Sequence, residues 1–232
     1  MISIFLSHPL TSLLVTLSGF AFFKWLQDKS NGNSLLNPVV WAIVICVIFI
    51  KISGIDYATY MEGVSIIHFL LGPVTVALAV PLYRLIIVIR KDALAILCAI
   101  GVSCIIAAFS AMFIAYMMDA SQDIQLAITS KSVTAPIAIE IANKINTPES
   151  LAIFFVFTTG IPGSLLATFI FKMMNVKDER TQGLALGTTC HGLGTARAFQ
   201  ISETAGTYAI IGMSIMGILS GLCLPAIILY LL

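Results

Sequence analysis

Residues 187–200, GTTCHGLGTARAFQ, place glycines, threonines, a histidine and an arginine between stretches that are apolar enough to lie in a membrane. A polar side chain in hydrocarbon costs free energy unless another group of the protein satisfies it. Each glycine also weakens a helix by about 1 kcal/mol relative to alanine. The stretch therefore predicts an interrupted helix that holds polar groups at membrane depth.

The composition of the whole chain indicates that most of it is surrounded by lipid rather than by water. Hydrophobic residues make up 59% and charged residues 10%, whereas soluble domains carry about 25% charged residues. The mean hydropathy is +1.04. Because open strand edges are not tolerated in lipid, we expect an all-α polytopic membrane protein with a single membrane domain over 1–232. The net charge is +1, and no basic patch in the sequence indicates nucleic-acid binding.

Seven stretches are apolar enough to cross the bilayer, and an eighth, 124–145, is more polar. A span needs about 20 apolar residues. The sequence thus predicts about seven transmembrane helices plus a re-entrant or broken segment, as in transporters with discontinuous helices. The seven stretches are 4–23, 36–53, 64–83, 93–118, 151–171, 183–200 and 208–232.

The Lys and Arg residues of the short loops predict the orientation. Loops 24–35, 84–92 and 172–182 are basic, whereas 54–63, 119–123 and 201–207 contain no Lys or Arg. The basic loops should be cytoplasmic, with the N-terminus outside. Positions 119 and 172 then lie on opposite sides, so an odd number of crossings separates them. Segment 124–145 is therefore the one expected not to span.

Segment 124–145 contains its own reason for a break. Pro136 has no N–H and clashes with the carbonyl of Ser132 in a regular helix. The backbone around it should be irregular, with hydroxyl groups from Ser130 and Thr134 beside free carbonyls. Irregular backbone at membrane depth is tolerated only when it is buried in protein or lines a wet cavity.

Stretch 64–83 is interrupted as well, by Pro73 and Pro81. Interrupted apolar segments in both halves of a chain indicate the binding site of a transporter. GPVTVALA (72–79) is weakly similar to APIAIEIA (135–142). This similarity leaves an internal repeat open.

The glycine-rich stretch also has the chemistry to bind an anion. If the helix restarts after Gly192 or Gly194, its free N–H groups and positive dipole end face the break. The Arg197 guanidinium matches a carboxylate with two hydrogen bonds. Alternatively, Arg197 snorkels at a helix end. His191 is either a satisfied interior histidine or a proton-linked switch.

We predict a site for a small carboxylate between the two interrupted segments. Lys131 is a second candidate cation, or else a topology anchor at the bilayer surface. The spacing of nucleophiles, bases and metal ligands indicates neither an enzyme, nor a metal site, nor a cofactor. The predicted substrate-binding residues are Arg197, His191, Gly192, Gly194, Thr195, Thr188, Lys131, Ser130, Thr134 and Pro136.

Four stretches resemble the LrgB/CidB family in order along essentially the whole chain. Two are similar to the family's signature stretches, SKSVTAPIA (130–138) and CHGLGTARA (190–198), and LLNP (35–38) and VALAVPLY (76–83) also fit. The chain departs from the family pattern at two positions. Cys190 stands where the family usually has Ser, and Ala135 where it often has a second Thr.

The resemblance implies transport of small monocarboxylates of the pyruvate, glycolate and lactate class in a bacterial inner membrane. It implies a separate small partner of the LrgA/CidA type, which a plastid glycolate and glycerate carrier contains as a fused segment. The alternative is an antiholin- or holin-like regulator of murein hydrolase export and cell lysis. A buried cluster of Arg, His and hydroxyl groups favours transport, because a simple pore does not need it. Whether the partner is required, and whether homo-oligomers form, is left open.

Overall fold

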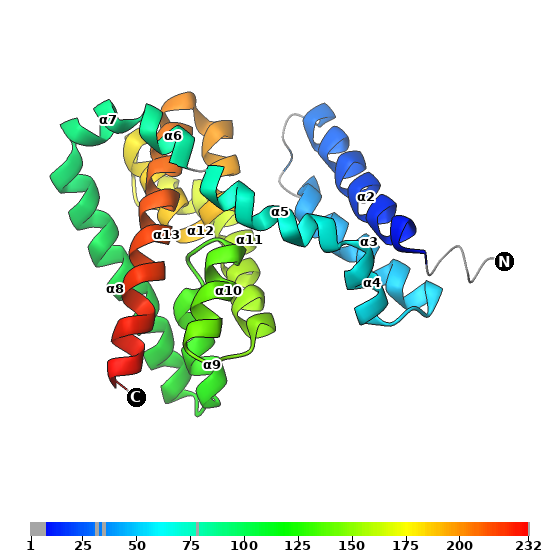
Figure 1. Ribbon diagram of the computed structural model, residues 1–232. Helices are drawn as coiled ribbons and strands as arrows, with labels where there is room; N and C mark the ends of the chain where they lie inside the picture. Colours follow the sequence, from blue (N-terminus) through cyan, green and yellow to red (C-terminus); the bar gives the residue numbers. More distant parts are fainter. Residues whose placement is uncertain (1–7, 31–32, 34–35, 78, 232) are drawn as a thin grey trace. The chain divides into compact units, whose positions relative to one another are not determined.

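The computed structural model describes residues 8–30, 33, 36–77 and 79–231, and within these ranges every regular element is helical (Figure 1). The all-α class is thus confirmed. The chain divides into two compact units, Met1–Val74 and Thr75–Leu232. All the predicted site residues lie in the second unit.

The first unit contains α2 (Pro9–Lys29), α3 (Pro38–Ser53), α4 (Tyr57–Gly63) and most of α5 (Ser65–Ala77). The helices begin where the sequence offers caps. Asn37 accepts hydrogen bonds from Val39 N and Val40 N, and Pro38 follows in the first turn, where its missing N–H costs nothing.

Among the described residues, four helices are long and apolar enough to cross a membrane: α2, α8 (Ala93–Met117), α11 (Glu149–Met173) and α13 (Glu203–Leu231). They correspond to the predicted spans at 4–23, 93–118, 151–171 and 208–232, although residues 4–7 and 232 lie outside the described ranges. Helix α3 is apolar but has 16 residues, about 24 Å against a hydrocarbon core of about 30 Å.

The predicted span 64–83 is divided. Helix α5 carries Pro73 in its interior, α6 (Ala79–Arg84) follows, and α7 (Ile86–Lys91) completes the connection to α8. Residue 78 and the side chain of Pro81 lie outside the description. None of these three described helices has the length of about 20 residues that a span needs.

The long helices of the second unit are fixed in direction by contacts at their ends. Tyr208, near the start of α13, donates a 2.8 Å hydrogen bond to Asp92, which precedes α8. Arg180, at the start of α12 (Glu179–Ile201), lies 3.8 Å from the same carboxylate. Gln182 bonds to the carbonyl of Val176, in the loop that follows α11. Helices α8 and α13 therefore start at the end where α11 stops.

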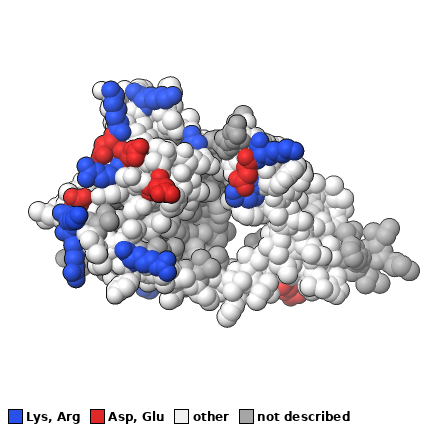
Figure 2. Space-filling model, turned by 90° about the horizontal axis from the view of Figure 1, so that it is seen from above, with Lys and Arg blue, Asp and Glu red and all other residues white. Residues whose placement is uncertain are grey.

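We call this end of the second unit the basic end. It is formed by residues 90–92, 172–182 and 201–208, and Figure 2, which views the chain from above Figure 1, shows Lys and Arg side chains gathered around it. The prediction that loops 84–92 and 172–182 lie on one side is thus confirmed. Which side of the membrane that is stays a prediction.

The segment between α8 and α11 is a hairpin that does not cross. It consists of α9 (Gln122–Ala127), a 3-10 turn at Ile128–Ser130 and α10 (Ala135–Lys144). Six and ten residues give arms of about 9 and 15 Å. Because α8 ends and α11 begins opposite the basic end, this first hairpin enters and leaves there. The predicted break before Pro136 and the failure to span are both confirmed.

Helix α12 is a second hairpin, which enters from the basic end. Ser202 donates a 2.8 Å hydrogen bond to Glu179, so the two ends of α12 meet. A Cβ on Gly194 would lie 2.1 Å from the Leu186 carbonyl oxygen, which shows how closely its arms pack. The prediction that 183–200 crosses is therefore wrong, and so is the placement of 201–207 opposite the basic loops.

The break in α12 also differs from the prediction. It falls at His191, with φ 44° and ψ −127°, rather than at Gly192 or Gly194. The glycines instead allow close approach of backbones. A Cβ on Gly187 would lie 2.1 Å from the carbonyl oxygen of Ala209 in α13.

The second unit contains an inverted repeat. Helices α8 and α11 each have 25 residues, run in opposite directions and are each followed by a hairpin of 23 positions. The first hairpin occupies the lower half of this unit in Figure 1 and the second the upper half. Both long helices end in a similar way, MMD (117–119) and MMN (173–175), with Asp119 and Asn175 at φ 53° and 54°. The repeat pairs 93–144 with 149–201, so the similarity of 72–79 to 135–142 does not mark it.

Candidate functional site

The tip of the second hairpin is held by His191. The ring is 5% exposed, and its Nε2 donates to the carbonyl oxygen of Val156 in α11 at 3.1 Å. Because φ 44° with ψ −127° is a region that glycine alone adopts easily, this backbone is strained by about 1–3 kcal/mol. The surroundings therefore hold His191 in place against its own preference.

Helix α11 makes room for this tip with two glycines that the sequence interpretation missed. A Cβ on Gly160 would lie 2.7 Å from His191 Nε2, and one on Gly163 would lie 2.3 Å from Cys190 Sγ. Both belong to TTGIPGS (158–164), which interrupts an otherwise apolar span. A proline flanked by two glycines within an apolar span is the sequence signal that could have identified this contact region.

The tip of the first hairpin also carries polar groups, and they lie inside the protein. Thr134 precedes α10 with extended backbone, and its Oγ1 is buried without a hydrogen-bond partner among the described residues. The Lys131 ammonium lies 3.4 Å from Ser132 Oγ. Ser130 donates to the Ala127 carbonyl at 2.9 Å. Pro136 sits in the first turn of α10, where a helix tolerates it.

The two tips approach each other. The half-buried Lys131 ammonium and the buried Cys190 thiol are close enough to interact electrostatically. Each tip also carries the N-terminus of a ten-residue arm, α10 in one hairpin and 192–201 in the other, and helix N-termini are positive. Within the described part of the chain, no carboxylate lies within 4.0 Å of Lys131.

The threonines of the second hairpin are already engaged. Thr188 donates to the Leu184 carbonyl at 2.8 Å, and Thr195 donates to the His191 carbonyl at the same distance. Bonds of this kind use the hydroxyl hydrogen within the helix itself. The oxygens remain acceptors, so these hydroxyls must rotate before they can donate a hydrogen bond to an anion.

Arg197 lies six residues beyond His191, about 9 Å along the arm toward the basic end. Its guanidinium donates to Thr168 Oγ1 at 2.9 Å and to Gln200 Oε1 at 2.7 Å. The Nε is buried without a partner, and no described carboxylate lies within 4.0 Å. The structure therefore divides the predicted set: His191, Gly192 and the first hairpin share the tips, whereas Arg197 sits closer to the basic end.

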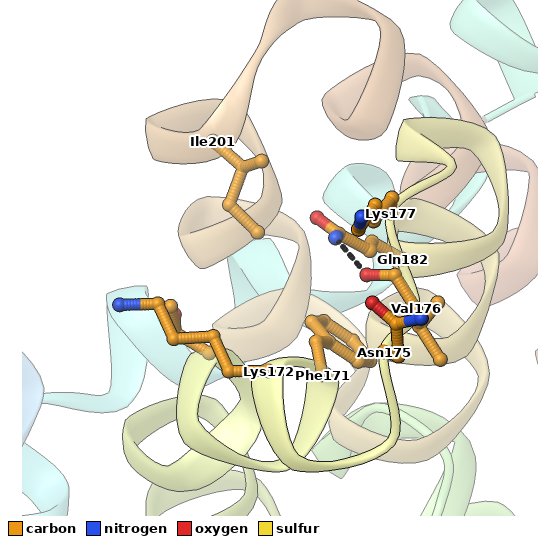
Figure 3. A pocket seen from close by; sticks show the side chains of 8 residues that line it. Phe171, Lys172, Asn175, Val176, Lys177, Gln182 and Ile201 are labelled. Atoms are coloured by element: carbon orange, nitrogen blue, oxygen red, sulfur yellow. Dashed lines mark hydrogen bonds between the residues drawn. The ribbon is translucent and has the colours of Figure 1, made fainter.

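A pocket of about 390 Å³ lies beside Arg197 at the basic end. Thr168, which accepts the hydrogen bond from Arg197, forms part of its wall. Figure 3 shows Gln182 bonded to the Val176 carbonyl across the loop, Phe171 and Ile201 approaching from two helices, and Lys172 pointing away from the others. The pocket is lined by Thr168, Phe171, Lys172, Asn175, Val176, Lys177, Gln182 and Ile201.

Residues 16–230 match the LrgB-like family, and the chain belongs to this family of membrane proteins. It is 30% identical over 223 residues to a protein of Staphylococcus aureus named holin-like protein CidB, covering 96% of both chains. A protein of the same name from Staphylococcus epidermidis is 29% identical over 217 residues, 94% of both. An uncharacterised protein of Haemophilus influenzae is 29% identical over 214 residues, 92% of this chain and 93% of that one. No solved structure matches.

Proposed function

We propose that this chain transports small monocarboxylates of the pyruvate, glycolate and lactate class. The observation that carries the proposal is the half-buried Arg197 guanidinium, whose Nε is buried without a partner and which faces no described carboxylate. A buried donor without a partner costs about 1–3 kcal/mol, and more when it is charged. A carboxylate in transit satisfies this donor and balances the charge.

The hairpins supply the remainder of a transport path. An anion entering from the basic end meets the pocket beside Thr168, then Arg197, and then the tips with Lys131 and the positive ends of two helix arms. Many transporters are built from inverted repeats with interrupted helices, and access to the site at the repeat interface alternates as one part moves against the other. No bond is made or broken along this path.

Each predicted site residue has a role in this proposal. Lys131 and the free amides in the first turns of α10 and of arm 192–201, the turns that contain Pro136, Gly192 and Gly194, neutralise the anion at the tips. Hydroxyl groups on both hairpins orient it, and His191 holds the tip of the second hairpin in position through its hydrogen bond to the Val156 carbonyl. The orienting hydroxyls are those of Ser130, Thr134, Thr188 and Thr195.

We further propose a bacterial inner-membrane location with the N-terminus outside. In this proposal the chain is the large subunit of a two-component system, and a small LrgA/CidA-type membrane protein is its partner. The basic loops support the orientation through the positive-inside rule.

A second candidate function is holin- or antiholin-like control of murein hydrolase export and cell lysis. The names of the staphylococcal relatives favour it. A pore subunit of this kind does not depend on the charge of Arg197, which separates the two candidates.

Uptake of labelled pyruvate and glycolate into cells that lack their own carriers tests the proposal. The chain is expressed alone, with an LrgA-type partner, and with the partner plus Arg197→Ala. Lys24→Ala is the matched control, because Lys24 is an exposed cation paired with Asp28. We expect saturable uptake that Arg197→Ala reduces by at least about tenfold, since a hydrogen bond to a charged group contributes about 1.5–3 kcal/mol. Absent uptake with altered lysis would instead support the second function.

A further inference from the structure

Ser214 is a buried hydroxyl that none of the roles above uses. It lies inside α13, is 9% exposed, and its Oγ has no hydrogen-bond partner among the described residues. Helix α13 otherwise is an apolar span, in which serine is commonly satisfied by bonding back to its own helix. An orphan hydroxyl at such a position indicates a missing partner.

The face of α13 that carries Ser214 packs against the first hairpin. Gly217 and Gly221 lie three and seven residues after Ser214, on the same helix face. A Cβ on Gly217 would lie 2.6 Å from Ile137 Cδ1, and one on Gly221 would lie 3.6 Å from Ile137 Cγ2. Ile137 is in the first turn of α10. This face of α13 is therefore directed at the N-terminus of α10.

The depth of Ser214 follows from the helix directions. Helices α10 and α13 both run away from the basic end. Ser214 precedes Gly217 by three residues, so it lies about one turn nearer that end. Thr134 precedes Ile137 by three residues in the same sense. Ser214 Oγ and Thr134 Oγ1, both buried and unpaired among the described residues, thus lie at corresponding levels beside the start of α10.

We propose that Ser214 contacts the substrate and, together with Thr134, binds the oxygen on its second carbon. This inference rests on the proposed transport function and deepens it. A hydroxyl both donates and accepts, so it satisfies a 2-oxo group as well as a 2-hydroxy group. The carboxylate of the same molecule faces the α10 amides and Lys131. A site with buried hydroxyls rejects an analogue that leaves them unpaired. The chain therefore prefers 2-oxo and 2-hydroxy monocarboxylates to unsubstituted ones.

Competition against labelled pyruvate uptake, measured with the partner present, tests this inference. The competitors are unlabelled pyruvate, lactate and propionate, which share a three-carbon chain and differ at the second carbon. We expect the wild type to prefer pyruvate and lactate to propionate by at least about tenfold, and Ser214→Ala to reduce this preference by about fivefold or more. The inhibition constant of propionate should stay unchanged.

Ser220→Ala is the matched control, because Ser220 is a fully buried serine of the same helix that pairs with Cys104 Sγ at 3.4 Å. It should leave the preference unchanged. If Ser214→Ala does not reach the membrane, Ser214→Cys replaces it, since a thiol of similar shape bonds more weakly and should lower the preference partway. Uptake with the same preference in the Ser214 variant overturns this inference alone. Absence of uptake in the wild type overturns it together with the transport function.

Discussion

Ser202 and Glu179 lie 23 residues apart in the sequence, and their side chains are joined by a hydrogen bond of 2.8 Å. A straight helix would separate these positions by about 35 Å. The bond therefore requires that α12 turn back on itself, and it places the start of α13 beside the start of α12. The crossing pattern of the second unit follows from this relationship.

Thiol labelling checks this crossing pattern. Single cysteines are introduced by Glu179→Cys, Ser202→Cys and Asn146→Cys in a chain whose native cysteines are replaced by alanine. A membrane-impermeant maleimide should label the first two from the same side of the membrane and Asn146→Cys from the other. Labelling of Ser202→Cys and Asn146→Cys from one common side would show that α12 crosses.

The close approach of α12 and α13 makes Gly187 intolerant of a side chain. A Cβ there would lie 2.1 Å from the backbone oxygen of Ala209, which has no freedom to move away. Gly187→Ala should lower stability by about 1–3 kcal/mol, the usual cost of overpacking. Gly101→Ala in α8 is the control, because nothing lies within 4 Å of its Cβ position. Thermal unfolding in detergent should show a lower Tm for Gly187→Ala and an equal or higher Tm for the control.

The strained backbone at His191 predicts that replacement by glycine and replacement by alanine differ in stability. His191→Ala and His191→Gly both remove the ring and its hydrogen bond to Val156. Only glycine, however, adopts φ 44° with ψ −127° without strain. His191→Gly should therefore be the more stable of the two by about 1–3 kcal/mol. Equal Tm values for the two variants would show that the tip relaxes to an ordinary helical conformation.

The cap of α12 predicts a dependence on pH. Hydrogen bonds from Thr181 to Asp178 hold the pKa of this exposed carboxyl below its ordinary value. Its stabilising contribution is therefore fully present above the ordinary carboxyl pKa and disappears as the pH falls through the lowered pKa. The difference in Tm between the wild type and Asp178→Ala should shrink across that acidic range. A difference that stays constant with pH would contradict the role of the ionised cap.

Local signals were sufficient to predict the first hairpin but not the second. Pro136 disfavours a helix that runs through it but suits the first turn of a new one, as in α10. The loop charges independently indicated that 124–145 does not cross. In α12 the glycines indicated an interruption, but the fold-back depends on distant contacts, such as those of Gly183 and Gly187 with Ala205 and Ala209. Loop 201–207 contains no Lys or Arg, so the positive-inside rule had no residue with which to place it on the basic side.

The candidate site divides in the same way. The residue types for an anion site could be found in the sequence, because Arg, Lys and His are rare at membrane depth. Their grouping in space could not be predicted, because the position of Arg197 relative to the tips depends on where α12 turns back and arm 192–201 begins. Whether a hydroxyl such as Ser214 finds a partner depends on neighbours in other helices, and a single sequence does not contain that information.

In the proposed function, this chain carries a small carboxylate past Arg197 and the two hairpin tips. The most direct measurement is counterflow of labelled pyruvate in liposomes that contain the purified chain and its small partner. Liposomes preloaded with unlabelled pyruvate should accumulate label transiently, and both Arg197→Ala and Lys131→Ala should abolish the accumulation at equal protein content. Accumulation that persists in both variants would place the path elsewhere. Release of pyruvate together with unrelated larger solutes, without counterflow, would contradict a carrier and indicate a pore.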